Sequence, residues 1–127
     1  MWPWPRRKPK TLGQRGEDLA VHHLKRSGYR ILERNVVLGR HEIDIIAREG
    51  DTIAFVEVKT RVTNSFADPE INVTPDKQRR IRRAAHQYMD AHDDPTCYYR
   101  FDIVSVVLPE DGPPAVTLHR DAFPDQR

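Results

Sequence analysis

Residues 41–61 read HEIDIIAREGDTIAFVEVKTR, and this stretch decides the fold. Apolar and β-branched residues dominate two runs, residues 41–48 and 52–61, as they do in the strands of a sheet. The Glu49-Gly50-Asp51 segment between the runs is a hairpin signal. If Gly50-Asp51 forms a two-residue turn, Glu49 pairs with Thr52. The stretch therefore predicts two adjacent antiparallel strands.

Three charged residues, Asp44, Glu57 and Lys59, interrupt these apolar runs. Counting back along the antiparallel ladder places Asp44 opposite Glu57, and alternation puts Glu57 and Lys59 on one face. Charges inside apolar strands are costly to bury unless they are paired or hold a metal. The spacing predicts two carboxylates and a lysine that converge. A three-residue turn would shift the register by one residue and weaken this prediction.

A converging group of this kind suits a hard divalent cation, which takes one or two protein carboxylates together with phosphate and water. Such a cation polarises a phosphate and lowers the pKa of an attacking water. Lys59 is then suited to stabilise the charge that develops on the phosphate. The structural alternative is an exposed Glu57–Lys59 pair that holds nothing. The arrival of Asp44 from the neighbouring strand favours a phosphodiesterase that uses Mg²⁺ or Mn²⁺.

On the N-terminal side, residues 1–10 combine prolines, tryptophans and basic side chains, which predicts a disordered arm. Thr11 and Gln14 match a capping box that opens a helix, and Gly28 is suited to end it. Glu17 lies at the edge of the apolar face of this helix. By itself, Glu17 would be explained by its favourable interaction with the helix dipole near the start of the helix. Together with the acids of the strands, it is a candidate metal ligand or water-positioning base. The apolar face comprises Leu12, Leu19, Ala20, His23, Leu24 and Ser27.

On the C-terminal side, residues 62–75 lack periodicity and predict a long surface loop. A second helix is expected from residue 74 to about residue 91, with an apolar stripe. Two further strands follow at residues 99–108 and, more briefly, 115–118. We expect one domain over residues 11–122 and a flexible tail over residues 123–127. The first strand is expected at residues 29–35, and the stripe of the second helix comprises Ile81, Ala84, Ala85, Tyr88 and Met89.

The second helix carries an unusual charge pattern, because basic residues crowd its first two turns, where the helix dipole prefers acids. A phosphate backbone that passes this helix end would explain the pattern, although each residue alone fits a solvated face equally well. Lys77, Arg80 and Arg83 follow i, i+3 spacing and form one ridge. The candidate nucleic-acid contacts are Lys77, Arg79, Arg80, Arg83 and Arg61.

Composition narrows the protein class. The chain has 127 residues, of which 38% are hydrophobic and 31% charged, so one ordinary globular core is expected. No apolar run reaches the ~18 residues of a membrane span, and the N-terminus lacks the pattern of a secretory signal. Cys97 is the single cysteine, which excludes an intrachain disulfide and fits the cytoplasm. Asp102, in another apolar strand, is interpreted as structural.

Several ordered motifs resemble the YraN-like family of bacterial proteins, which are assigned as endonucleases. The resemblance covers residues 11–120 approximately, and His41 departs from it, because the family usually has glycine before Glu-Ile-Asp. The matching segments are Gly13–Ala20, Gly28–Leu32, Arg34-Asn35, Glu42–Ala47, Phe55–Arg61 and Arg100–Val104.

This resemblance implies the PD-(D/E)xK nuclease superfamily and a layout similar to that of archaeal Holliday junction resolvases. It implies that Glu17 is the helical acid, that Asp44 and Glu57 are metal ligands and that Lys59 is the catalytic lysine. The related resolvases work as two-fold dimers, so a homodimer is a further expectation.

The predicted fold class is α/β and restriction-endonuclease-like, with a mixed, mainly antiparallel central sheet flanked by helices and the acids at one edge. We expect a metal-dependent endonuclease that acts on DNA, with branched or single-stranded regions as candidate substrates. The alternative is a nucleic-acid-binding module in DNA processing or repair that does not cut. An adaptor protein is a third alternative, but it predicts an exposed apolar patch, and the sequence has no obvious one.

Overall fold

The computed structural model describes residues 8–63 and 71–126. The expected arm therefore lies mostly outside the described residues, as does much of the expected loop. The elements are α1 (Leu12–Arg26), β1 (Arg30–Leu38), β2 (His41–Glu49), β3 (Thr52–Thr63), α2 (Pro75–Ala91), β4 (Tyr98–Pro109) and β5 (Ala115–Phe123). None of the helices in the described part is long and apolar enough to cross a bilayer.

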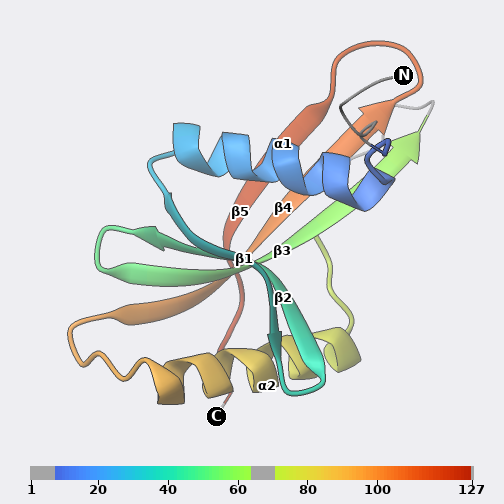
Figure 1. The fold of residues 1–127 in the computed structure, drawn as a ribbon. Coiled ribbons are helices and arrows are strands. Elements are labelled where there is room, and N and C mark those ends of the chain that lie inside the picture. Colours follow the sequence, from blue (N-terminus) through green and yellow to red (C-terminus); the bar gives the residue numbers. More distant parts are fainter. Residues whose placement is uncertain (1–7, 64–70, 127) are drawn as a thin grey trace, which may run out of the picture.

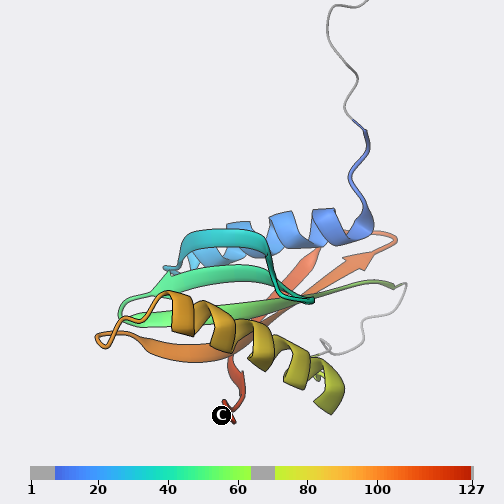
Figure 2. The same ribbon diagram turned by 60° about the horizontal axis from the view of Figure 1, so that its bottom comes forward.

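The five strands form one sheet in the order β1-β2-β3-β4-β5. Only the β3–β4 pairing is parallel, and the other three pairings are antiparallel. A parallel pairing needs a crossover, and α2 lies within the connection between these two strands. Helix α1 covers one face of the sheet and α2 the other (Figures 1 and 2). The predicted α/β class, with a mixed and mainly antiparallel sheet flanked by helices, is confirmed.

The core divides into two layers, one on each side of the sheet. The layer under α2 contains the five predicted residues of its apolar stripe, packed against aromatic residues such as Phe55 and Phe101. The layer under α1 contains Ala20 and Leu24, packed against Val56 of β3. Two layers around one sheet bury both of its faces, which explains why the central strands read as nearly continuous apolar runs.

Both predicted helix starts are confirmed. Thr11 caps α1 in a capping box with Gln14, and Thr74 caps α2 by accepting a hydrogen bond from the Lys77 amide. Gly28 follows the end of α1 with a φ of 96°, which a residue with a side chain rarely adopts. Leu12, which the helical period places on the buried face, is 41% exposed because it stands in the first turn at the rim of the sheet.

Gly16 allows α1 to approach β3 closely. A Cβ atom added at Gly16 would lie 1.8 Å from the Thr60 Oγ1 atom, far inside the contact distance of two heavy atoms. The sequence of α1 therefore needs glycine at this position. Because Glu17 is the next residue, this contact also fixes the distance of its carboxylate from β3.

The C-terminal end differs from the prediction. Strand β5 extends to Phe123, five residues beyond the expected end at residue 118, and Phe123 is buried. The Arg82 side chain on α2 donates a hydrogen bond of 2.9 Å from Nε to the Pro124 carbonyl, and its guanidinium lies over the Phe123 ring. The boundary at residue 122 is wrong for Phe123 because these contacts to a distant helix are not visible in the local sequence.

Candidate active site between two strands

The predicted β2–β3 hairpin register is confirmed. Gly50 has a φ of 62°, and Glu49 pairs with Thr52. The regular pairing continues to Ile45 and Val56 and ends one residue short of Asp44. Beyond this point a side chain takes the place of the backbone pairing between the strands. The Oδ2 atom of Asp44 accepts a hydrogen bond of 2.8 Å from the Val58 amide. The acids therefore lie between two inner strands and not at an edge of the sheet.

Asp44 lies where the alternation of side chains along β2 is interrupted. Ile45 packs into the layer under α1, whereas Ile43 packs into the layer under α2, although strict alternation would place both on one face. Asp44 accordingly opens onto both sides of the sheet. It lines a cavity of about 420 Å³ on the α1 side and another of about 360 Å³ on the α2 side.

Glu57 meets Asp44 as the register predicts, and the two side chains share a hydrogen bond. Burial, together with the Asp44 charge, raises the pKa of Glu57 to about 7. Burial also raises the pKa of Asp44, against the opposing effect of the Val58 amide. Ionising both of two carboxyl groups in contact costs free energy, because the two negative charges repel each other. The pair therefore holds a proton near neutral pH unless a cation replaces it.

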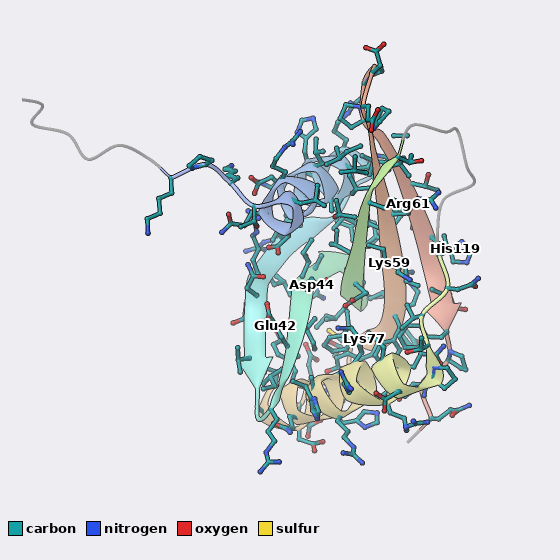
Figure 3. The ribbon with its side chains drawn as sticks, turned by 90° about the vertical axis from the view of Figure 1, so that its right-hand side faces the viewer. Glu42, Asp44, Lys59, Arg61, Lys77 and His119 are labelled. Atoms are coloured by element: carbon teal, nitrogen blue, oxygen red, sulfur yellow. The ribbon has the colours of Figure 1, made fainter. Side chains whose placement is uncertain are left out.

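Lys77 is the cation that faces this pair. Its Nζ atom lies 3.5 Å from Glu57 Oε1, and Figure 3 shows Lys77 pointing from α2 toward the sheet. Its charge lowers the pKa of both acids but does not cancel the effect of burial. Lys77 was predicted as a nucleic-acid contact, and the structure brings it to the acids as well.

Lys59 lies on the same side of β3 as Glu57, and both line a cavity with Ser105 of β4. The Lys59 amine donates a hydrogen bond to the Asn72 carbonyl, in the segment that leads into α2. Figure 3, which views the molecule from the side on which both helices begin, shows Lys59 at the strands of the sheet, above Lys77 of α2.

Glu17 reaches Asp44 from the α1 side, since both residues line the same cavity. Its Oε1 atom accepts two hydrogen bonds, one of 3.0 Å from Arg34 Nε and one of 2.9 Å from Asn35 Nδ2. Asn35 has a φ of 52° inside β1, a conformation that asparagine tolerates better than most residues. This break in β1 allows two successive side chains, Arg34 and Asn35, to reach the same carboxylate.

Glu17 and Glu57 approach Asp44 from two sides, but the three acids do not form one compact group. Within residues 8–63 and 71–126, no three His, Cys, Asp or Glu side chains are grouped closely enough to hold a metal ion together. The contacting Asp44 and Glu57 carboxylates nevertheless offer the oxygen atoms that Mg²⁺ and Mn²⁺ prefer. The donor set therefore fits a divalent cation held by two carboxylates, with Glu17 on the far side of Asp44.

Residues 16–106 match the family described as uncharacterised protein family UPF0102. The chain belongs to the UPF0102 family. This is the YraN-like group that the motifs indicate, and the match includes Glu17, Asp44, Glu57 and Lys59.

Relatives of similar length support this assignment. A UPF0102 protein of Geotalea daltonii is 44% identical over 114 residues, which cover 90% of each chain. One of Chlorobaculum parvum is 46% identical over 99 residues, covering 78% of this chain and 77% of its own. One of Caldicellulosiruptor saccharolyticus is also 46% identical over 99 residues, covering 78% and 84%.

The basic residues of this UPF0102 chain divide into groups. Lys77 and Arg80 line the cavity on the α2 side of Asp44, and Arg61 lines the one that contains Glu57 and Lys59. Arg79 and Arg80 both pair with Asp76, and Arg83 is exposed. Arg82 is instead buried against the C-terminal end, so it does not belong to the ridge.

Sequence reasoning missed four residues of the site. Arg34 and Asn35 hold Glu17, and Arg40 and His41 line the cavity on the α2 side of Asp44. Asparagine inside a predicted strand was one available signal, because it tolerates positive φ. The position of Arg40 and His41 depends on how the β1–β2 turn meets α2, and no local pattern predicts that contact.

Proposed function

We propose that this protein is a metal-dependent endonuclease that hydrolyses phosphodiester bonds in DNA. The observation that carries the proposal is the contact between the Asp44 and Glu57 carboxyl groups where β2 and β3 separate. A protein rarely keeps two acids of raised pKa in one cleft without a ligand or a reaction that uses them. The charge of Lys77 and the nearby Lys59 suit a phosphate that approaches the same place.

Each residue has a distinct part in this proposal. Asp44 and Glu57 would hold Mg²⁺ or Mn²⁺, which polarises the phosphate and lowers the pKa of an attacking water. The Val58 amide orients the Asp44 carboxylate, and Arg34 and Asn35 orient Glu17. Lys59 would leave the Asn72 carbonyl and stabilise negative charge on the phosphate oxygens. Glu17 is then suited to position water from the α1 side.

The test is cleavage of labelled duplex, single-stranded, flap and four-way-junction DNA with Mg²⁺, Mn²⁺ or EDTA. Asp44→Asn and Lys59→Met should abolish cutting while the proteins stay folded. Glu110→Gln, a change to an exposed acid at the end of β4, is the matched control and should cut normally. Metal-independent cutting, or cutting that survives both site substitutions, would exclude these residues as the catalytic group.

A nucleic-acid-binding module that does not cut is the competing function. The Lys59 contact with the Asn72 carbonyl favours it, because a catalytic lysine must be able to reach the phosphate. The same experiment separates the two functions. Tight binding with no cutting of any substrate in either metal would support the binding module.

A further inference from the structure

A second charged cavity adjoins the acid pair on the α2 side of Asp44. It measures about 360 Å³ and is lined by Arg40 of the β1–β2 turn, by His41, Glu42 and Asp44 of β2, and by Lys77, Arg80 and Ile81 of α2. Three of these side chains are arginine or lysine, and His41 adds an imidazole. No single element supplies this cluster, since the hairpin and the helix contribute two basic residues each.

Packing holds the two halves of the cavity in place. Gly39, at the tip of the hairpin, has a φ of 63°, and a Cβ atom there would lie 3.0 Å from the Gln87 amide nitrogen on α2. The turn therefore rests directly on the helix. On the other side, the cap at Thr74 fixes the first turn of α2, which carries Lys77. The four basic side chains therefore extend from anchored backbone.

The two cavities that meet at Asp44 differ in charge. Among the described residues, the cavity on the α1 side is lined by Glu17, Asp44, the first turn of α1 and uncharged residues, and Lys8, Lys10 and Arg34 line the cavity next to it. The one on the α2 side contains the basic cluster. Each cavity adds one carboxylate to that of Asp44, Glu17 on the α1 side and Glu42 on the α2 side. The α2 side also has Arg40, Lys77 and Arg80, so a phosphate group that reaches Asp44 is favoured there.

We propose that Arg40, His41, Lys77 and Arg80 form a phosphate subsite, which binds a backbone phosphate of a nucleic acid strand beside the phosphate that reaches Asp44. This inference rests on the proposed function, because it names the substrate contact of the same site. Arginine side chains from two directions suit the oxygens of a phosphodiester.

The present partners of these cations do not block the subsite. Arg80 pairs with Asp76, and both side chains are more than half exposed, at 57% and 59%. Exposed pairs of this kind are weak, so a phosphate can replace the carboxylate. Lys77 keeps its contact with Glu57, and thereby links the subsite to the acid pair.

The test is a double-mutant cycle on binding of a labelled single-stranded oligonucleotide in EDTA. Arg40→Gln and Arg80→Gln should each weaken binding several-fold, up to roughly tenfold. The double variant should weaken it by less than the product, because both side chains hold one phosphate. Arg40→Gln with Arg83→Gln is the matched control pair, since Arg83 is exposed on the same helix and does not line the cavity.

Two further measurements strengthen the cycle. The slope of log affinity against log salt should become shallower by about 0.7 for each phosphate contact that is lost. Because Arg40 and Arg80 share one phosphate, the double variant should lose no more than about 0.7 in total. Thermal unfolding should confirm that all variants fold. His41→Gln gives a second, independent variant and should also weaken binding, without altering the melting temperature.

Additive effects of Arg40→Gln and Arg80→Gln, an unaltered affinity in Arg40→Gln, or no binding of the oligonucleotide would overturn the subsite. The result is independent of catalysis because EDTA removes the cation. If the Arg40–Arg80 coupling appears but no DNA is cut in Mg²⁺, the nuclease proposal fails and the subsite stands. If Mg²⁺-dependent cutting appears without coupling, the nuclease stands and the subsite fails.

Discussion

Asp102 and the Asp44–Glu57 pair are acids in similar apolar strands, but their surroundings differ. Asp102 is fully buried and accepts four hydrogen bonds: 2.7 Å from Tyr29 Oη, 2.8 and 3.0 Å from Arg100, and 2.9 Å from the Asp121 amide. This carboxylate has a full set of donors and a counter-charge, which is the arrangement of a structural ion pair.

Within the described part of the chain, the Asp44–Glu57 pair has fewer hydrogen-bond donors than Asp102. Among the described residues, the Val58 amide donates to Asp44, and the Lys77 amine lies 3.5 Å from Glu57. Burial consequently raises the pKa of both acids. The contrast teaches that burial of an acid is not by itself a sign of function. An acid whose charge the fold leaves uncompensated is the better sign.

The largest effect that the comparison predicts is on Asp102. Asp102→Asn removes the buried carboxylate that pairs with Arg100 and leaves Glu49, which is 28% exposed, as its counter-charge. We therefore expect the free energy of unfolding to fall by about 3–5 kcal/mol. Urea denaturation at pH 8 in EDTA measures it. A loss below about 1 kcal/mol would show that the network around Asp102 is not structural, and would remove the contrast.

The next largest effect has the opposite sign. Glu57→Gln removes one of two repelling carboxylates, so at pH 8 in EDTA we expect it to raise the free energy of unfolding by roughly 1–3 kcal/mol. The same substitution should abolish Mg²⁺-dependent cleavage. Destabilisation at pH 8 would contradict the assignment of Glu57 as an uncompensated acid.

The pH dependence follows from the same shift. The pKa of Glu57 is higher in the folded protein, about 7, than its ordinary value of 4.5. The folded state therefore binds more protons than the unfolded state between these values, and stability falls as pH rises. In EDTA the stability of the wild type should decline from about pH 4.5 to pH 7, relative to Glu57→Gln. Parallel stability curves would contradict the shift.

A smaller effect on stability is expected for Asn35→Gly. Glycine adopts the positive φ of 52° without strain, and the substitution removes the side-chain amide that holds Glu17. The free energy of unfolding should therefore change by less than about 1 kcal/mol. Cleavage should nevertheless fall, because Glu17 loses one of its two donors. Asp121→Gly is the matched control, since Asp121 also has positive φ, at 55°. Equal activity of both variants would show that Asn35 does not position Glu17.

The smallest effect on stability is expected for Lys77→Met. The lysine side chain is 45% exposed and its pair with Glu57 is long, so the expected change is about 0.2–1 kcal/mol. The pKa of Glu57 should rise further, because the Lys77 charge lowers it. Titration by NMR measures this change, with Arg83→Ala as the control. A fall in the pKa of Glu57 would contradict the proposed electrostatics.

Much of this arrangement was predictable because it depends on local signals. Gly50-Asp51 fixed the hairpin register, and the register brought Asp44 to Glu57. The same local pattern, however, surrounds Asp102. One signal separated the acids in the sequence: Arg100 lies two residues before Asp102, on the same face of the strand. The donors Tyr29 and Asp121 come from distant segments, and no local pattern predicts them.

Other features depend on contacts between distant segments. The end of regular β2–β3 pairing before Asp44 lies opposite the break in β1 at Asn35, and the length of β5 depends on Arg82 and Phe123. In the sequence, spacing placed Lys77, Arg80 and Arg83 on one ridge, but nothing indicated which basic residues of α2 face the sheet. Helix packing then made Arg82 structural and turned Lys77 and Arg80 toward Asp44, because only some faces of α2 meet the sheet.

The most direct test of the central claim is an NMR titration of the Glu57 carboxyl carbon, with and without Mg²⁺. The account predicts a pKa near 7 in EDTA and a fall of more than one unit in saturating Mg²⁺, because the cation replaces the shared proton. The Asp102 carboxyl signal should not respond to Mg²⁺. A Glu57 pKa near 4.5 in EDTA, or one that Mg²⁺ leaves unchanged, would contradict the claim that this acid pair is a cation site.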